Sequence, residues 1–318
     1  MENFTMISIG DILARNSKST EVISQPLLGK GESLMLWAES GIGKSLFTLH
    51  WMVALASGRD FGPWNTLGPQ KVCYLDMEMS APEITDRLKD AKTSGYFERG
   101  ALKNMSFISD AFTSSSEWMD SRFDLNDPED VCSIIEQLKT QHTDILVIDN
   151  LTTASDSITS ENDAAALRRV LSNLKQILLE GFSLVLIHHS TKANGSYRGS
   201  GSLESIFHTV VRADSVSSSD GPCLDIIAKK CRSGRFRVND KWRWSFKDGS
   251  WTEATTKEDE WLNHVLTTAE NGTFETQKEL ASALGVTPKV ITEAKQALIR
   301  SGRTNGDMWD RLFLKNIP

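Results

Sequence analysis

The middle of the chain alternates short apolar runs with longer segments of helical pattern, and this alternation constrains the fold more than any other feature. Strands that alternate with helices in this way form βαβ units and a mostly parallel sheet. The runs expected to form strands are LMLWA (34–38), VCYLD (72–76), SFIS (106–109), ILVID (145–149) and LVLIHH (184–189). The segments expected to form helices are 44–57, 81–92, 128–140 and 161–180.

The segment 206–246 has a different pattern. Its β-rich runs FHTVV, CLDIIA, RFRV and WRWSF follow one another with no helical segment between them. We expect them to add antiparallel strands at one edge of the sheet. A polar loop is expected over residues 110–127. The predicted fold class is therefore α/β, with a mostly parallel sheet.

A polar stretch, KDGSWTEATTK at 247–257, predicts a linker. A chain of 318 residues is long enough for one large and one small domain, which we expect to span 1–250 and 251–318. In the smaller domain, apolar residues trace two helices joined at 285–287, and a short turn containing glycine is typical of a helix-turn-helix. A hairpin in the tail, 301–318, would make this domain a winged helix.

Composition excludes several classes of protein. No apolar run approaches the roughly 18 residues that span a bilayer, and the N-terminus lacks the basic and apolar regions of an export signal. The cysteines are too sparse for a disulfide scaffold and have no metal-ligand spacing; they are Cys73, Cys132, Cys223 and Cys231. We therefore expect a cytoplasmic protein with no membrane partner.

Residues 38–45, AESGIGKS, match the phosphate-binding loop pattern with alanine in place of the first glycine. Gly41 and Gly43 allow the backbone to curl so that successive N–H groups point at phosphate oxygens, and the following helix N-terminus adds positive charge. Lys44 would bridge the β- and γ-phosphates, and Ser45 would hold Mg²⁺. The sequence thus predicts ATP and Mg²⁺ as ligands. The residues expected to bind the nucleotide are Glu39, Ser40, Gly41, Ile42, Gly43, Lys44, Ser45 and Leu46.

Two further strand ends carry carboxylates. ILVID ends in Asp149, and a carboxylate at this position in phosphate-loop proteins supports the Mg²⁺ shell. In the segment YLDMEMS, Glu78 could activate the water that attacks the γ-phosphate, with Asp76 as the competing choice. The alternative for this segment is a solvated strand end with a helix cap at Ser80. Spacing alone does not decide between these interpretations.

Two other pairs are candidates for catalysis. His188 and His189 end a central strand, where they could sense the γ-phosphate or have a purely structural role, and the sequence does not show which of them faces the phosphate. Lys230 and Arg232 are spaced i, i+2 on a strand and so point to one face. They could act in trans on the γ-phosphate of a neighbouring subunit, or they could form a solvated basic strand end.

The motifs AESGIGKS, YLDMEMS, ILVIDNL, SENDAAALRRVL, LIHHSTK, RGSGSLESIFHTVVR and AKKCR occur in an order that resembles the RecA-like hexameric ATPases. Within that family the chain resembles most the plasmid replication helicase RepA and its phage and mobile-element relatives, over residues 20–245. The resemblance implies a RecA-like core in a ring, usually of six subunits, with ATP at the subunit interfaces. It also implies roles for the candidate residues: Glu78 as the catalytic base, the histidine doublet as the γ-phosphate sensor, and Lys230 and Arg232 as the trans-acting finger.

The same resemblance implies that the loops after residue 190, with Lys192 and Arg198, line a central channel and contact single-stranded DNA. Two features depart from the family. His208 stands where the family has an aspartate, and the segment from 257 onward is not part of the minimal RepA-like helicase.

The charge distribution allows a nucleic-acid partner although the chain carries a net charge of −7. Residues 188–243 contain ten basic and five acidic side chains, and a ring would concentrate this positive charge around its hole. Trp242 and Trp244 could stack on bases, although we favour an apolar face of an edge strand. Residues 257–318 hold eight basic and nine acidic side chains, so protein contact is as consistent with them as duplex binding.

These observations leave three hypotheses. The leading one is an ATP-driven ring motor on single-stranded DNA, a replicative helicase of a plasmid, phage or mobile element. The second is a RecA-like regulatory or loader ATPase that controls a protein partner through nucleotide-dependent assembly, without unwinding. The third is a DNA-binding regulator that reads duplex through the C-terminal domain. A replication or mobile-element protein is the partner expected for that domain.

Overall fold

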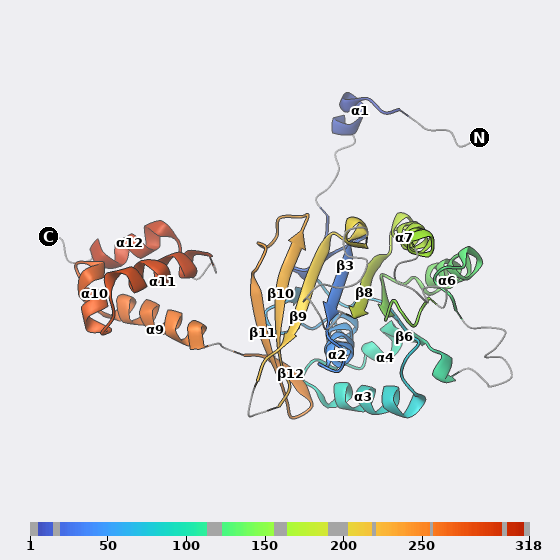
Figure 1. Ribbon diagram of the computed structural model, residues 1–318, viewed down its shortest axis with the longest axis horizontal. Helices are drawn as coiled ribbons and strands as arrows, with labels where there is room; N and C mark the ends of the chain where they lie inside the picture. Colours follow the sequence, from blue (N-terminus) through green and yellow to red (C-terminus); the bar gives the residue numbers. More distant parts are fainter. Residues whose placement is uncertain are drawn as a thin grey trace. The chain divides into compact units, whose positions relative to one another are not determined.

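The computed structural model describes residues 6–14, 20–112, 123–155, 164–189, 203–217, 221–254, 257–300 and 304–314 (Figure 1). The chain divides into two compact units, Met1–Glu253 and Ala254–Pro318. Among the described residues, no helix has the length and apolar character needed to cross a membrane.

The larger unit is built on one nine-stranded sheet with the order β12-β11-β10-β9-β3-β8-β7-β5-β6. Its strands are β3 (Ser33–Ala38), β5 (Val72–Asp76), β6 (Met105–Ile108), β7 (Ile145–Asp149), β8 (Ser183–His189), β9 (Thr209–Ser215), β10 (Cys223–Cys231), β11 (Lys241–Lys247) and β12 (Ser250–Glu253). Strands β9 to β6 are parallel, and β10, β11 and β12 continue the sheet in antiparallel pairing. The predicted α/β class with a mostly parallel sheet is therefore confirmed.

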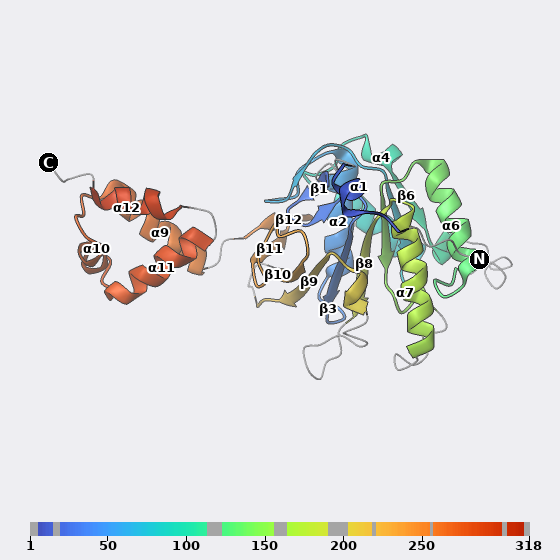
Figure 2. The ribbon, with the colours of Figure 1, turned by 90° about the horizontal axis from the view of Figure 1, so that it is seen from above.

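Helices cover the two faces of the parallel strands (Figure 2). The helices of this unit are α1 (Ile9–Ala14), α2 (Lys44–Ser57), α3 (Ala81–Thr93), α4 (Ala101–Asn104), α6 (Pro128–Gln141) and α7 (Ala164–Leu179), with 3-10 turns at Asp110–Phe112 and Glu204–Ile206. α2 packs on one face and α6 and α7 pack on the other, each over its own apolar core. Because both faces are covered, the central strands are continuous apolar runs.

Three expectations for the antiparallel part were wrong. The run FHTVV contributes to β9, which pairs in parallel with β3 and is antiparallel to β10. The run RFRV does not form a strand, because the Arg235 side chain reaches back to the carbonyl of Pro26 and to Glu32 while Phe236 is buried. The predicted linker also starts too early, since its residues Ser250–Glu253 form β12. Trp251 is fully buried there, and that burial outweighs the polar character of its neighbours.

A second, three-stranded antiparallel sheet lies beside the main one in the element order and was not predicted, with two strands before β3 and one after α2. It has the order β2-β1-β4, with β1 at Val22–Gln25, β2 at Leu28–Gly29 and β4 at Asn65–Thr66. Strands of two to four residues are too short to show a period in the sequence.

An aromatic cluster joins α2 to the antiparallel strands. Its members are fully buried: Phe47, Phe61, Trp64, Trp244 and Trp251. Phe47 lies at the centre, with edge-to-face contacts to the other four rings at centroid distances of 5.2 to 5.6 Å. Such pairs contribute beyond the area that they bury. Trp242 packs at the edge of the same core, so the two tryptophans of β11 form an apolar face and not a surface for stacking bases.

The smaller unit is helical. It contains α9 (Lys257–Asn271), α10 (Gln277–Ala283), α11 (Pro288–Arg300) and α12 (Gly306–Leu314). The turn between α10 and α11 includes Gly285 with φ 68°, in the left-handed region that favours glycine. The predicted hairpin in the tail was wrong. Residues 306–314 are helical because Trp309 and Phe313, four residues apart, bury one side of α12 in the core of this unit.

Candidate nucleotide site

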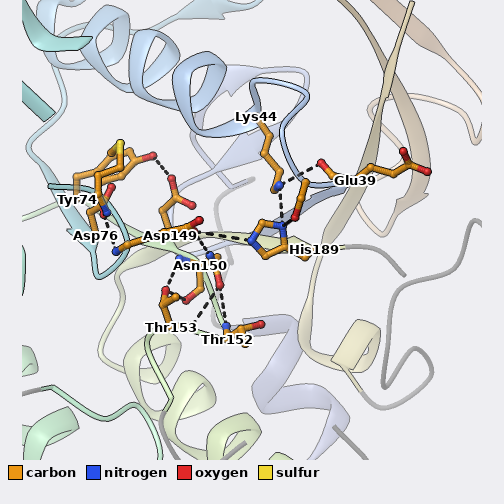
Figure 3. A network of polar contacts seen from close by, with 12 residues as sticks. Glu39, Lys44, Tyr74, Asp76, Asp149, Asn150, Thr152, Thr153 and His189 are labelled. Carbon is orange, nitrogen blue, oxygen red and sulfur yellow. Dashed lines mark hydrogen bonds and ion pairs between the residues drawn. The ribbon is translucent and has the colours of Figure 1, made fainter. Parts of the chain in front are cut away.

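The phosphate-binding loop, residues 38–45, connects β3 to α2 at the carboxyl edge of the parallel strands (Figure 3). Gly41 and Gly43 have φ values of 81° and 96°, which a side chain would disfavour. The Lys44 side chain is 4% exposed, and its Nζ donates to the carbonyl of Glu39 at 3.2 Å and to Nδ1 of His189 at 2.8 Å. Burial lowers the pKa of Lys44, against the charges of Asp149 and Glu78.

The structure separates the two histidines that the sequence left equivalent. Successive side chains of β8 point to opposite faces of the sheet. His189 lies beside Ala38, near the loop, with Nδ1 also 3.0 Å from Oγ of Ser40. His188 is 3% exposed and pairs in register with Trp37, whose side chain belongs to the core on the opposite face. Only His189 is therefore brought to Lys44, and the inclusion of His188 among the candidate catalytic residues is not supported by the geometry.

His189 also approaches a carboxylate. Its Nε2 lies 3.8 Å from Oε2 of Glu78. Burial, followed by the charge of Lys44, lowers the pKa of His189. A neutral imidazole accepts from Lys44 through Nδ1 and carries its proton on Nε2, which faces Glu78. The three side chains thus form a connected chain of polar contacts.

The two carboxylates after β5 have different surroundings. Asp76 is 1% exposed, and its Oδ1 accepts hydrogen bonds from the N–H groups of Glu78 and Met79 at 2.9 and 2.8 Å. The Glu78 side chain is 54% exposed and lies on the side of His189. Asp76 therefore shapes the turn, while Glu78 is the accessible carboxylate. The helix cap at Ser80 is present as well, because Ser80 and Glu83 form a capping box at the start of α3.

Asn150 belongs to this group and was missed in the sequence. Its Nδ2 donates to Oε2 of Glu78, and its Oδ1 accepts from the N–H groups of Thr152 and Thr153 at 3.0 and 3.2 Å. These contacts fix the amide and hold the Glu78 carboxylate in place. The only sequence signal was its position directly after Asp149.

The surroundings of Asp149 fit a divalent cation. This carboxyl is 2% exposed, and its Oδ2 accepts from the Tyr74 hydroxyl at 2.8 Å. Burial raises its pKa to about 6, although hydrogen bonds from Tyr74 and Ser45 favour the ionised form. Asp76 Oδ2 is also buried and has no hydrogen-bond partner among the described residues. Buried carboxylate oxygens beside a serine hydroxyl are hard ligands of the kind that Mg²⁺ prefers.

Lys230 and Arg232 lie at the opposite edge from the loop, the edge at which the parallel strands begin. Cys231, between them, pairs with Thr209 of β9, which pairs with Leu34 near the start of β3. At about 3.3 Å per residue, this places them roughly 13 Å along the strands from Ala38, where the loop begins. Lys230 donates to the carbonyl of Glu204 and Arg232 to that of Ser205. The structure therefore does not bring this pair to Lys44 of the same chain.

Lys192 and Arg198, the candidate DNA contacts, lie outside the described residues. Ion pairs balance several of the cations counted for this region. Arg243 forms two hydrogen bonds to Asp225, at 2.6 and 2.8 Å, and Arg212 and Arg235 pair with Asp214 and Glu32. Asp214 and Asp225 were already included in the count of five acidic side chains, so only the pairing of Arg235 with Glu32 lowers the positive surplus, by one charge.

His208, which stood in place of an expected aspartate, has a structural role. Its Nδ1 accepts from the N–H of Ser33 at 3.1 Å and lies 2.9 Å from the Ser33 hydroxyl. Burial lowers the pKa of His208, in keeping with a neutral acceptor. The residue fastens the start of β9 to the start of β3, away from the loop.

Comparison with known proteins agrees with this geometry. Residues 2–195 match the AAA_25 family, described as an AAA domain. The fold is similar to the crystal structure of KaiC-like protein PH0186 from the hyperthermophilic archaeon Pyrococcus horikoshii OT3, with a TM-score of 0.53 and 14% sequence identity. The similarity covers 73% of this chain and 94% of that one. No curated protein matches the chain by sequence.

Proposed function

Because the chain belongs to the AAA_25 family of AAA domains, we propose that it is an ATP-hydrolysing ring motor that acts on single-stranded DNA. The family and the fold support a RecA-like ATPase. The observation that carries the ATP-hydrolysing part of the proposal is the convergence of Lys44, Glu78, Asp149 and His189 at the end of the phosphate-binding loop. Of the motors of this kind, a replicative helicase of a plasmid, phage or mobile element agrees best with the order of the motifs.

The nucleotide would bind with its β- and γ-phosphates in the loop. The backbone N–H groups after Gly41 and Gly43 and the N-terminus of α2 would hold the phosphate oxygens. Lys44 would then exchange its contact with His189 for the phosphates. That exchange releases Nδ1 of His189, so the imidazole can respond to the presence or loss of the γ-phosphate.

Hydrolysis would use the accessible carboxylate. Glu78 would take a proton from the attacking water. Asn150 would orient the Glu78 carboxylate through the hydrogen bond that it donates to Oε2. Ser45 and Asp149 would hold Mg²⁺, which would supply positive charge to offset the negative charge that develops on the phosphate. Burial favours the protonated form of Asp149, and a bound cation would favour the ionised form instead.

A ring explains the pair at the other edge of the sheet. Lys230 and Arg232 lie too far from Lys44 to act on ATP bound to their own chain, whereas a head-to-tail ring would allow this edge of one subunit to meet the loop of the next. There they would stabilise the transition-state charge in trans. Single-stranded DNA would pass through the hole, with Lys192 and Arg198 as proposed contacts.

The runner-up is a RecA-like regulatory or loader ATPase that controls a protein partner without unwinding. Two observations favour it: several basic side chains in 203–243 form ion pairs, and the C-terminal unit has balanced charge. In this reading the helices α10 and α11, proposed as a helix-turn-helix, would contact a replication or mobile-element protein in place of duplex DNA.

One set of assays tests these proposals. ATP hydrolysis is measured with and without single-stranded DNA, together with strand displacement and electron microscopy in a non-hydrolysable analogue. Lys44→Ala should abolish hydrolysis, while Lys71→Ala, an exposed lysine at the opposite end of β5, should not. DNA-stimulated hydrolysis and displacement would support the motor. Nucleotide-dependent assembly with no response to DNA would support the regulator, and a chain that binds no nucleotide would overturn both.

A further inference from the structure

Trp251 lies against the phosphate-binding loop although it comes more than 200 residues later in the chain. It is fully buried on β12, the last strand before the C-terminal unit. A Cβ atom placed on Gly43 would lie 3.8 Å from Cζ2 and 4.0 Å from Cη2 of Trp251. Apart from the chain neighbours Ile42 and Lys44, no other side chain of the described residues comes within 4 Å of that position. The indole therefore faces Gly43, the N-cap of α2, at a distance where even a β-carbon would only reach van der Waals contact with it.

The same ring also supports the first turn of α2. Phe47, one turn into the helix, meets Trp251 edge-to-face at 5.3 Å, and Phe246 lies 5.1 Å away on the other strand of the hairpin. The Tyr96 hydroxyl donates to the carbonyl of Trp251. The indole is thus held in place by groups from α2, from β11 and from the segment that follows α3.

This support matters because the loop would bind the phosphates of the nucleotide through its backbone N–H groups. Gly43 has φ 96° and is the residue before Lys44, so its conformation sets where the N–H groups of Lys44 and Ser45 point. A glycine has no side chain to fix that conformation, and its freedom costs entropy when the loop is ordered. A large rigid ring beneath it reduces the conformations available to the loop before the nucleotide arrives.

We propose that Trp251 is a positioning residue for nucleotide binding, and that it makes β12 sensitive to occupancy of the loop. The inference rests on the proposed binding of ATP. Because β12 ends at Glu253 and the C-terminal unit begins at Ala254, the strand that touches the loop also leads into that unit. Binding that tightens the loop around phosphate would tighten β12 as well.

Binding of ADP, measured by calorimetry well below the unfolding temperature, tests the proposal. Trp251→Leu should weaken ADP binding about tenfold or more. Trp251→Phe should keep most of the wild-type affinity for ADP, because it retains a flat ring beside Gly43. Trp64→Leu is the matched control. It removes the same volume from the same aromatic cluster, where Trp64 also contacts Phe47 but does not approach Gly43. Its thermal stability should fall comparably, with ADP affinity within about twofold of the wild type.

The outcomes are distinct. Equal loss of ADP affinity in Trp64→Leu and Trp251→Leu would show that Trp251 contributes only to the packing of the core, and would overturn the proposal. Wild-type ADP affinity in Trp251→Leu would overturn it as well. Hydrogen exchange of the wild-type chain gives a second reading if Trp251→Leu does not fold. The amides of 250–253 should exchange more slowly with ADP, and unchanged exchange would contradict the proposal. A wild-type chain that fails to bind ADP would instead overturn the proposed ATPase.

Discussion

The two edges of the same sheet carry charged residues with opposite surroundings. At the carboxyl edge, Lys44 meets His189 and His189 approaches Glu78, so each charged group has a partner of complementary chemistry in the same chain. At the opposite edge, the side chains of Lys230 and Arg232 donate to backbone carbonyls within the part of the chain that the structure describes. The first edge is a site that one chain can assemble, whereas at the second the charge of Glu204 acts on Lys230 and no ion pair to either cation is formed among the described residues.

The strands explain this difference. Parallel strands end at one edge, and each is followed by a loop, so polar side chains from distant parts of the chain converge there. The antiparallel strand β10 runs back, and its last residues reach the other edge. The following predictions test whether the two edges act on one ATP molecule across a subunit boundary, or whether the second edge is only structural.

The largest effect is expected at the second edge. Arg232→Ala should lower ATP hydrolysis about 10³- to 10⁵-fold if the guanidinium stabilises transferred charge in trans. Mixing Arg232→Ala with Lys44→Ala should restore activity, because about one head-to-tail interface in four then combines an intact loop with an intact finger. A mixture as inactive as its components would contradict action across the boundary and leave Arg232 a structural role.

At the first edge, Glu78→Gln should lower kcat by about 10²- to 10⁴-fold while ADP affinity changes little, because the amide keeps its shape but cannot take the proton. Single-turnover hydrolysis separates this from a defect in binding. Glu83→Gln is the control, since Glu83 is an exposed carboxylate of the α3 capping box, outside the contacts around Lys44. Equal losses in both variants would refute the role of Glu78.

A matched pair tests the two faces of β8. His189→Gln should lower kcat by about ten- to a hundredfold, since it removes the group between Lys44 and Glu78. His188→Gln should leave kcat nearly unchanged but lower the unfolding temperature, because His188 is buried on the opposite face. Steady-state kinetics and thermal unfolding of both variants check this. A large loss of kcat in His188→Gln with little loss in His189→Gln would show that His188, and not His189, acts in catalysis.

The smallest effect concerns α2, which links the loop to the core. His50 is fully buried, and burial lowers its pKa to about 4. The unfolded chain binds this proton near pH 6.5, so stability should be intact above that pH and fall by about 3 kcal/mol as pH drops to 4. His50→Leu should lose less stability over this interval in urea unfolding. An identical pH dependence in both proteins would exclude His50 as the cause.

Local chemistry explains what could be predicted. The loop needs its glycines, lysine and serine in consecutive positions, so its presence was visible from the sequence, as were the buried strand that ends in Asp149 and the helices with clear caps. Residues whose role depends on distant partners were not predictable. The amide of Asn150 serves Glu78 from another strand, and His208 fastens two strands whose residues are 175 positions apart.

Two of the errors, in the tail and in the predicted linker, have one cause. The tail 301–318 and the stretch 247–257 contain enough glycine and polar residues to favour turns, yet Trp309 and Trp251 turn parts of them into a helix and a strand. Burying a tryptophan contributes more than local preferences of a few tenths of a kcal/mol per residue. Only the folded structure provides the core in which that burial occurs.

The sequence by itself therefore determined an α/β chain with a phosphate-binding loop, because binding through consecutive backbone groups is a property of consecutive residues. Tertiary structure decided which histidine faces the loop, that Glu78 and not Asp76 is the accessible carboxylate, and that Lys230 and Arg232 lie at the far edge. Those outcomes depend on strand order and direction, which bring together residues that the sequence holds far apart.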